Sequence, residues 1–498
     1  MHSNSNLTAQ LHEIAQSLHA KSREVGLDPQ TTVFELVDYK QLNEVAAYGG
    51  FPTRYPHWRW GMEYERLSKS YTYGLSVIYE MVINNDPCYA YLLRSNSLVA
   101  QKTVIAHVYG HSDFFKNNYW FSKTNRKMLD QMANHANMVR RIIDEVGHDE
   151  SENFIDVCLS LENLIDIHSS FRASTKALSQ EEVENMGKKP VAKLHAERSY
   201  MDRYMNPQEY LDQQRKKIED SAEKMQKFPQ QPTHDVLRFL LDFAPMSSWQ
   251  KKILQLVRDE AYYFAPQGQT KILNEGWATY WHSKMMTKLA PLHASEIVDY
   301  CDHYAGVVAN HGGQMNPYRL GVSLLRHIEK RWDRGQFGME YQNIDDYQQR
   351  SRWDTQVGKG QEKIFEIRRY HNDVTFLEEY FDEDFCHESK MFLYDYDERS
   401  GKQIISNRQF KDIKNYLLKM LTNLGNPRIS VSDGNYHNRG ELLLEHHHEG
   451  VDLQHEYTIE VLRNLHRVWK RPVHIKTVID SIAKCVGFDG HNHSLERM

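Results

Sequence analysis

Apolar side chains recur at helical spacing through most of the first 390 residues. The earliest such segment covers residues 7–25 and ends before Gly26, a residue that commonly follows a helix. One face of this segment is apolar and consists of Leu7, Leu11, Ile14 and Leu18. We expect similar helices over most of the stretch from Tyr64 to Trp120, with an interruption near Pro87.

The pattern changes after about residue 390, where short apolar runs alternate with turn signals such as Asp433-Gly434. Amphipathic helical segments lie between these runs, which is typical of a small α+β domain. The chain has 498 residues, which favours more than one domain. We therefore predict a mainly α protein with a large helical core over 1–390, a small α+β domain over 391–488 and a tail over 489–498.

Residues 180–230 differ from the rest of the predicted core because charged residues are dense and apolar residues are few. This composition predicts an exposed helical excursion that ends in a linker rich in Pro and Gln. Such a charge pattern is usually a solvated surface. The sequence also predicts a helix break at Pro266-Gln267-Gly268, followed by a new helix from about Thr270.

The composition disfavours several classes of protein, among them nucleic-acid binders, disulfide-rich proteins and membrane proteins. The net charge is −6 with His neutral, which disfavours a dedicated nucleic-acid binder. The five cysteines are far apart and form no CxxC pair, as expected in a reducing compartment. We find neither a secretory h-region nor an apolar stretch of bilayer length, so the sequence predicts a cytoplasmic protein without stable membrane insertion. It does not indicate the oligomeric state.

The segment KTVIAHVYGHSDFF carries two histidines, His107 and His111, four residues apart. On a helix this spacing places both imidazoles on one face, where they can bind one metal ion. Two histidines at this spacing also arise by chance in a chain with 27 His, and Gly110 weakens the helix between them. The pair alone is therefore a weak signal.

A second segment, TKILNEGWATYWHSK, contains Glu275. Its Asn-Glu-Gly-Trp-Ala element is similar to the segment that supplies the third ligand in several zinc peptidases. Two histidines from one helix and a glutamate from a later helix form a ligand set that zinc accepts, with water in the fourth position. We predict a zincin-like helical site in which His107, His111 and Glu275 bind zinc.

The sequence departs from the HExxH zinc-peptidase motif at Val108, where that motif places its general base. Asp113 and Glu260 are the candidates for a replacement catalytic carboxylate, although a salt bridge or helix cap is the more common role of such residues. Asn274 and His282 are predicted to support the ligands. His282 lies two turns beyond Glu275, about 10.5 Å along a helix, which is too far for both side chains to bind one ion.

Six blocks, in order along the chain, resemble the stage V sporulation protein R (SpoVR) family. The resemblance extends from about Tyr39 to Val478. The blocks are GGFPTRYPHWRWGMEYERL, YEMVINNDPCYAYL, IAHVYGHSDFFKNN, RDEAYYFAPQGQTKILNEGWATYWH, NPYRLG and DGNYHNRGELLLEHHHEG.

The resemblance implies a cytoplasmic bacterial protein that acts in formation of the spore cortex, a peptidoglycan layer. Members of the family often share an operon with a PrkA-type serine kinase and a protein with a von Willebrand-type domain, which makes these two proteins candidate partners. It supplies no biochemical activity, so two functions stay open. The first is a metal-dependent hydrolase of amide bonds, and the second is a non-catalytic regulator or scaffold that binds such partners.

Overall fold

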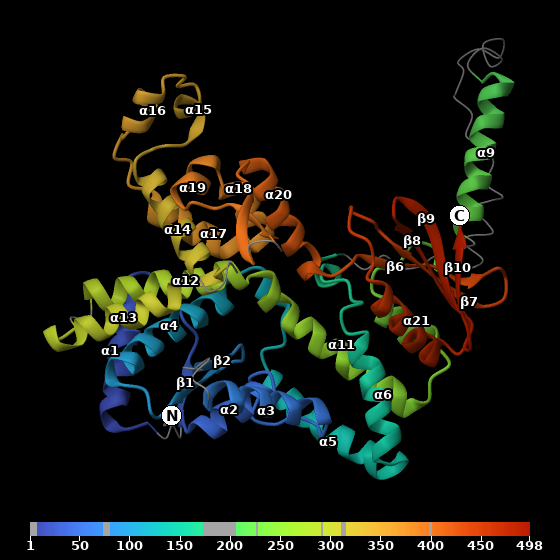
Figure 1. The fold of residues 1–498 in the computed structure, drawn as a ribbon, viewed down its shortest axis with the longest axis horizontal. Coiled ribbons are helices and arrows are strands. Elements are labelled where there is room, and N and C mark those ends of the chain that lie inside the picture. Colours follow the sequence, from blue (N-terminus) through green and yellow to red (C-terminus); the bar gives the residue numbers. More distant parts are fainter. Residues whose placement is uncertain are drawn as a thin grey trace. The chain divides into compact units, whose positions relative to one another are not determined.

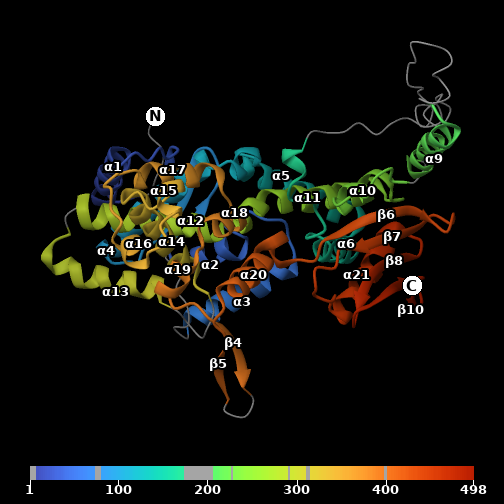
Figure 2. The same ribbon diagram turned by 90° about the horizontal axis from the view of Figure 1, so that it is seen from above.

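The structure, a computed structural model, describes residues 7–72, 80–172, 206–225, 228–289, 292–309, 315–397 and 401–498. Within these ranges the chain is mainly helical, as predicted, and it also contains three small β-sheets (Figures 1 and 2). No helix in the described ranges is long and apolar enough to cross a membrane. Most of the predicted excursion at 180–230 lies outside the described residues, but its part at Gln208–Met225 is helical (α9).

The chain divides into two compact units, each built from two separate segments. The first unit combines Met1–Ser151 with Tyr262–Gly425, and the second combines Glu152–Ala261 with Asn426–Met498. This division differs from the predicted boundary at residue 390. A change in sequence pattern reports local structure, whereas the division depends on which distant segments pack together.

Helices make up most of the first unit. They are α1 (Ala9–Glu24), α2 (Tyr39–Ala47), α3 (Trp58–Thr72), α4 (Leu98–Asn117), α5 (Met128–Val146), α12 (Lys271–Lys284), α13 (Ile297–Val308), α14 (Pro317–Asp333), α15 (Gly338–Gln342), α16 (Tyr347–Arg352), α17 (Gly360–Tyr370), α18 (Asp373–Tyr380), α19 (Glu383–Glu388) and α20 (Phe410–Leu421). Its strands are β1 (Thr32–Val37), β2 (Glu80–Ile83), β3 (Cys88–Leu93), β4 (Leu393–Asp397) and β5 (Lys402–Asn407). Strands β4 and β5 form an antiparallel ribbon, as the change of pattern near residue 390 predicts.

A three-stranded sheet of order β1-β3-β2 corrects the prediction of a largely helical stretch from Tyr64 to Trp120. Strand β1 pairs with β3 in parallel, and β2 pairs with β3 antiparallel. Four consecutive residues of β3, from Ala90 to Leu93, are buried. Periodicity alone cannot distinguish such a continuous apolar run from a buried helix. The sequence therefore left this sheet undetected.

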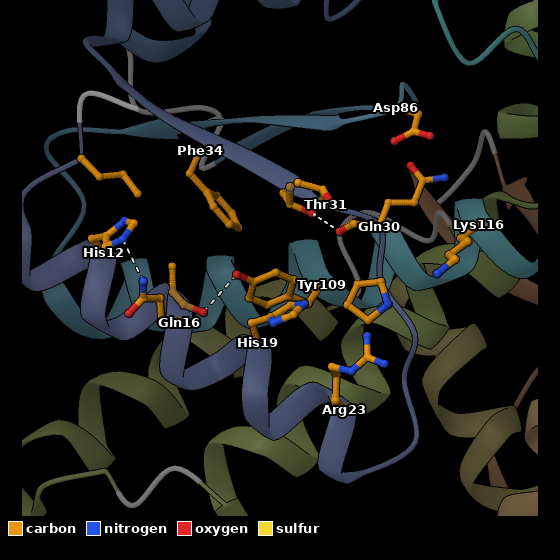
Figure 3. Close-up of a pocket in the computed structure, with 14 residues that line it drawn as sticks. His12, Gln16, His19, Arg23, Gln30, Thr31, Phe34, Asp86, Tyr109 and Lys116 are labelled. Carbon is orange, nitrogen blue, oxygen red and sulfur yellow. Dashed lines mark hydrogen bonds between the residues drawn. The ribbon is translucent and has the colours of Figure 1, made fainter. Parts of the chain in front are cut away.

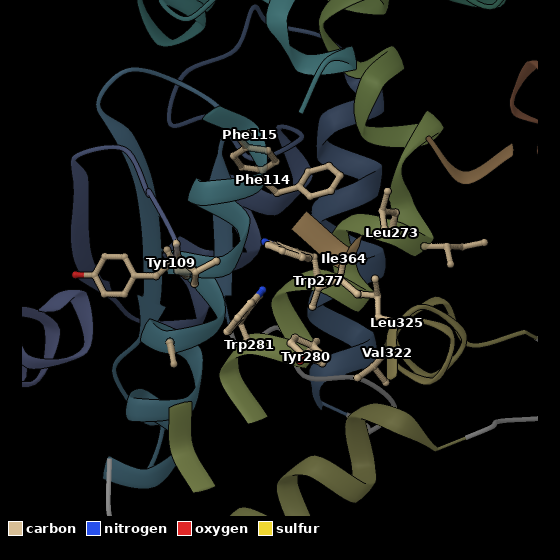
Figure 4. Packing of buried hydrophobic residues seen from close by; sticks show 14 of the residues in the cluster. Tyr109, Phe114, Phe115, Leu273, Trp277, Tyr280, Trp281, Val322, Leu325 and Ile364 are labelled. Atoms are coloured by element: carbon tan, nitrogen blue, oxygen red, sulfur yellow. The ribbon is translucent and has the colours of Figure 1, made fainter. Parts of the chain in front are cut away.

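Helices α4, α12 and α14 pack side by side in the centre of the first unit (Figure 1). Helix α4 begins after Ser97, whose hydroxyl accepts a hydrogen bond from Ala100 N–H at 3.2 Å. Its side chains are buried on every face, as expected of a helix at the centre of a core. Figure 4 shows Trp277 and Trp281 of α12 within this core.

Glycines allow these three helices to approach closely. A Cβ atom on Gly110 of α4 would lie 2.7 Å from the Cα of Ala278 in α12. A Cβ atom on Gly321 of α14 would lie 2.1 Å from the carbonyl oxygen of Ile272. Gly110 therefore lies at a contact between two helices. This contact explains why a glycine, which lowers helix stability, occurs within α4.

Helix α11 (Ser248–Gln269) continues through Pro266, which corrects the predicted break at that point. The carbonyl oxygen of Pro266 accepts a hydrogen bond from the Thr270 hydroxyl at 2.7 Å. Helix α12 then begins at Lys271, close to the predicted start. Because Thr270 provides no side-chain cap, the first N–H groups of α12 need another acceptor.

Asp373 of α18 provides that acceptor. Its carboxylate accepts hydrogen bonds from the backbone N–H groups of Ile272 and Leu273, each at 2.8 Å. We expect Asp373→Ala to lower the free energy of unfolding by about 2 kcal/mol, because two buried N–H groups lose their partners. Urea unfolding measures the change. An effect below about 0.5 kcal/mol would show that water or another group replaces the carboxylate.

The second unit contains a five-stranded sheet of order β10-β9-β8-β7-β6. Its strands are β6 (Ile429–Tyr436), β7 (Glu441–His446), β8 (Val473–Ile479), β9 (Ile482–Phe488) and β10 (His493–Arg497). Its helices include α9, α10 (Val236–Phe243) and α21 (His455–Trp469). The chain passes from one unit to the other within α6 (His148–Ser160), within α11 and after Gly425. The small α+β region was predicted, but the tail expected at 489–498 instead carries the edge strand β10.

Candidate metal centre

The three predicted zinc ligands come together in the first unit. His107 and His111 lie one turn apart on α4, with ring centroids 4.5 Å apart. Glu275 extends from α12, and its Oε2 atom lies 3.5 Å from Nε2 of His107 and 3.4 Å from Nε2 of His111. Close packing of α4 on α12 brings these residues from distant parts of the sequence to one place.

These distances suit a shared metal ion better than direct hydrogen bonds. A charge-assisted N–H···O bond between an imidazolium and a carboxylate measures about 2.7–2.9 Å. Ligand atoms that each lie about 2.1 Å from a tetrahedral ion are instead roughly 3.4 Å from one another. The two Glu275 distances therefore match the edge of a metal tetrahedron.

The sequence did not identify a second carboxylate at this centre, Glu80. This residue begins β2, and its Oε1 atom lies 3.6 Å from Nε2 of His107. One ligand atom each from Glu80, His107 and His111 lie within 4.8 Å of one another. Glu80 begins a strand of only four residues, which pairs with β3, and local sequence gave no signal that its side chain lies beside His107. The block YEMVINNDPCYAYL contains it without indicating a role.

Both carboxylates are largely buried, with 18% of the Glu80 side chain and 14% of the Glu275 side chain exposed. In the described part of the chain, the Oε2 atom of each has no hydrogen-bond partner. Burial raises the pKa of Glu80 above its usual value. Burial also tends to raise the pKa of Glu275, but His111 and His107 outweigh it and hold that pKa low. Two buried carboxylates with free oxygens are the expected surroundings of a cation.

The other ring nitrogens of the two histidines contact Asn274 and His282, the residues that the sequence placed in support of the ligands. Nδ1 of His111 lies 2.9 Å from Oδ1 of Asn274. Since an amide oxygen only accepts hydrogen bonds, this contact places a proton on Nδ1 and leaves Nε2 as the ring nitrogen that faces Glu275. Nδ1 of His107 lies 2.9 Å from Nδ1 of His282, whose pKa is lowered well below its usual value by burial and by His107.

Replacing Asn274 with leucine tests whether its contact with His111 contributes to zinc binding. The variant removes the acceptor for His111 Nδ1–H, so we expect affinity for zinc to fall about 10–100-fold. Asn274→Asp is the matched control because it keeps an acceptor oxygen, and it should retain most of the affinity. Competition with a chromogenic chelator measures both. Equal zinc affinity in the leucine variant and the wild type would remove the proposed role of Asn274.

The two predicted catalytic carboxylates lie in different surroundings. Asp113 is fully buried, pairs with Arg368 at 3.1 Å and accepts a hydrogen bond from Trp277 Nε1 at 2.9 Å. Its carboxylate also accepts the backbone N–H of Asp28, so these bonds tie it into the packing of the unit. Glu260 is buried on α11, in the segment assigned to the second unit. A catalytic role for either residue stays a prediction.

Tyr318 of α14 lies beside the centre and was not singled out from the sequence. Its ring is nearly parallel to that of His107, with centroids 6.1 Å apart. The block NPYRLG contains this tyrosine, so the sequence offered a family signal but no geometric one.

The triple His446-His447-His448 in the second unit has other partners. These histidines contact Thr477, Ser430 and Asp452 respectively, at 2.8–2.9 Å. They are not part of the metal-binding arrangement found among the described residues. The three histidines are therefore a weaker candidate for a metal site than the centre on α4.

A cavity of about 550 Å³ lies against another face of α4 (Figure 3). One side of α1 contributes His12, Gln16, His19 and Arg23, and α4 contributes Tyr109 and Lys116. None of the residues that line it belongs to the metal centre. Tyr109 lies between His107 and His111 in sequence, so its side chain leaves the opposite side of the helix.

The centre thus offers two imidazole nitrogens and two carboxylates in a largely buried place. This donor set fits zinc, and such a site is catalytic when the protein supplies three ligands and leaves the fourth position to water. The sequence singled out His107, His111, Glu275, Asn274 and His282, and their part in binding zinc stays a prediction.

Comparison with known proteins agrees with the resemblance seen in the sequence. Residues 5–426 match the family described as SpoVR like protein, and residues 427–480 match the SpoVR-like C-terminal domain. The chain belongs to the SpoVR family. It is 27% identical over 472 residues to a protein of Escherichia coli (strain K12) named Uncharacterized protein YcgB, with 89% of this chain and 87% of the relative covered. No solved structure matches.

Proposed function

We propose that the protein is a metal-dependent hydrolase of amide bonds and that His107, His111 and Glu275 bind its zinc ion. The observation that carries this proposal is the separation of Glu275 Oε2 from the two Nε2 atoms, 3.5 and 3.4 Å, which equals that of ligands around a tetrahedral ion. When bound, zinc supplies Lewis acidity and a water that ionises near neutral pH. Asn274 keeps Nε2 of His111 directed toward the centre.

The expected substrate is an amide bond of peptidoglycan, in keeping with the cortex role that the family resemblance implies. Incubation of the zinc-loaded protein with peptidoglycan fragments, followed by mass spectrometry, tests this proposal. We expect cleavage products that carry a new amine and a new carboxylate. A chelator should abolish their formation, and added zinc should restore it. The proposal fails if the zinc-loaded protein yields no such products while a control amidase cleaves the same fragments.

A non-catalytic role as a regulator or scaffold is the alternative, with a PrkA-type kinase or a von Willebrand-type domain protein as proposed partners. The substitution Glu275→Gln separates the two proposals in a spore-forming host. If the variant folds and cortex formation stays intact, catalysis at this centre is not the function. Loss of cortex formation with unchanged partner binding would favour the hydrolase.

A further inference from the structure

A hydrolytic centre needs a group that accepts a proton from water, and Val108 cannot provide one. The zinc-peptidase motif places a glutamate directly after its first histidine, as the group that takes a proton from water. Here that position is Val108, which is fully buried and part of the hydrophobic core. Another group must therefore do this work if the centre is hydrolytic, and a second carboxylate beside the centre is the first candidate.

Glu80 occupies the place that such a carboxylate needs. Its Oε1 atom lies 3.6 Å from His107 Nε2, and its Oε2 atom is buried without a hydrogen-bond partner in the described part of the chain. No salt bridge to Lys or Arg is found for it within those same residues. Asp113, by contrast, has its oxygens bonded to Arg368 and Trp277.

The two glutamates differ in their relation to the histidines. Glu275 Oε2 is within 3.5 Å of both Nε2 atoms, as a third ligand should be. Glu80 lies to one side, nearest to His107, and comes from a strand rather than from the packed helices. Glu275 is therefore the better third ligand, and Glu80 is the nearby carboxylate that remains for proton transfer.

We propose that Glu80 is the catalytic residue that accepts and returns the proton, with His107, His111 and Glu275 as the ligands. One water proton moves to a Glu80 oxygen as the water oxygen forms a bond to the amide carbon. Glu80 then gives this proton to the amide nitrogen as the C–N bond breaks. Water and the amide yield one carboxylic acid and one amine, with no oxidant or reductant. This inference rests on the proposed hydrolase function.

Glu80→Gln in the full chain loaded with cobalt(II) tests the assignment. A glutamine keeps the size of the side chain but cannot accept the proton. We expect the variant to retain one cobalt ion per chain, with an affinity no more than about 100-fold below that of the wild type, as for a group outside the ligand set. Acetohydroxamate, which gives up a proton when it binds such centres, should bind at least tenfold more weakly. The cobalt absorption bands report its binding.

Glu35→Gln, on strand β1 of the same sheet, is the matched control and should change neither property. Loss of cobalt from Glu80→Gln as complete as from Glu275→Gln would make Glu80 a fourth ligand and overturn the inference. Wild-type affinity for both cobalt and acetohydroxamate would also overturn it. If the wild-type protein binds no ion, the proposed function itself fails, and circular dichroism separates that result from misfolding.

Discussion

Replacing Glu275 with glutamine is expected to lower zinc affinity by at least about a thousandfold, because a neutral amide replaces one of three charged or basic ligands. The side chain keeps its size, so the packing of α12 should survive. Titration against a fluorescent chelator measures the affinity. Glu145→Gln on the exposed surface of α5 is the matched control and should bind zinc as the wild type does.

Thermal unfolding provides a second measurement on the same variant. An ion that binds only the folded state stabilises it by about 2.7 kcal/mol at a concentration one hundred times its dissociation constant. Wild-type protein should therefore unfold at a higher temperature when zinc is added, and Glu275→Gln should not. An equal rise in both proteins would place the zinc at a different site.

Gly321→Ala is expected to destabilise the first unit by about 3–4 kcal/mol, the largest effect that we predict for a single methyl group. The new Cβ atom would lie 2.1 Å from the Ile272 carbonyl oxygen and 2.7 Å from the Cα of Gly276, and backbone atoms cannot move aside as a flexible side chain can. Helix α14 must therefore separate from α12. Because Glu275 precedes Gly276, zinc affinity should fall as well.

Gly306→Ala on α13 is the matched control for this prediction. A Cβ atom there meets nothing within 4 Å. Alanine also favours a helix over glycine by about 1 kcal/mol, so this variant should be as stable as the wild type or more so. Urea unfolding compares the two. Equal stability of the Gly321 and Gly306 variants would contradict the close contact between α12 and α14.

Features of the structure that depend on local sequence could be predicted well. The helical spacing of residues 7–25 marks α1, and the start expected near Thr270 matches α12. His107 and His111 could be paired because one turn of a single helix separates them. Glu275 could be added because its segment resembles the third-ligand segment of known zinc peptidases.

Features that depend on contacts between distant residues could not be predicted. Strand β1 pairs with the distant strand β3, Thr32 with Cys88, so the sheet that carries Glu80 could not be predicted. Asp373 caps α12 from about one hundred residues away, and Gly321 meets Gly276 across two helices. These contacts join segments that are far apart in the sequence. None of them can be predicted from the spacing of residues along one helix or strand.

The central claim is that one metal ion binds at His107, His111 and Glu275. The most direct measurement is an anomalous difference map from crystals grown with zinc, recorded on both sides of the zinc absorption edge. We predict one strong peak per chain about 2.1 Å from Nε2 of His107, Nε2 of His111 and a carboxylate oxygen of Glu275. A map with no peak there, or with its strongest peak at His446-His447-His448, would contradict the account.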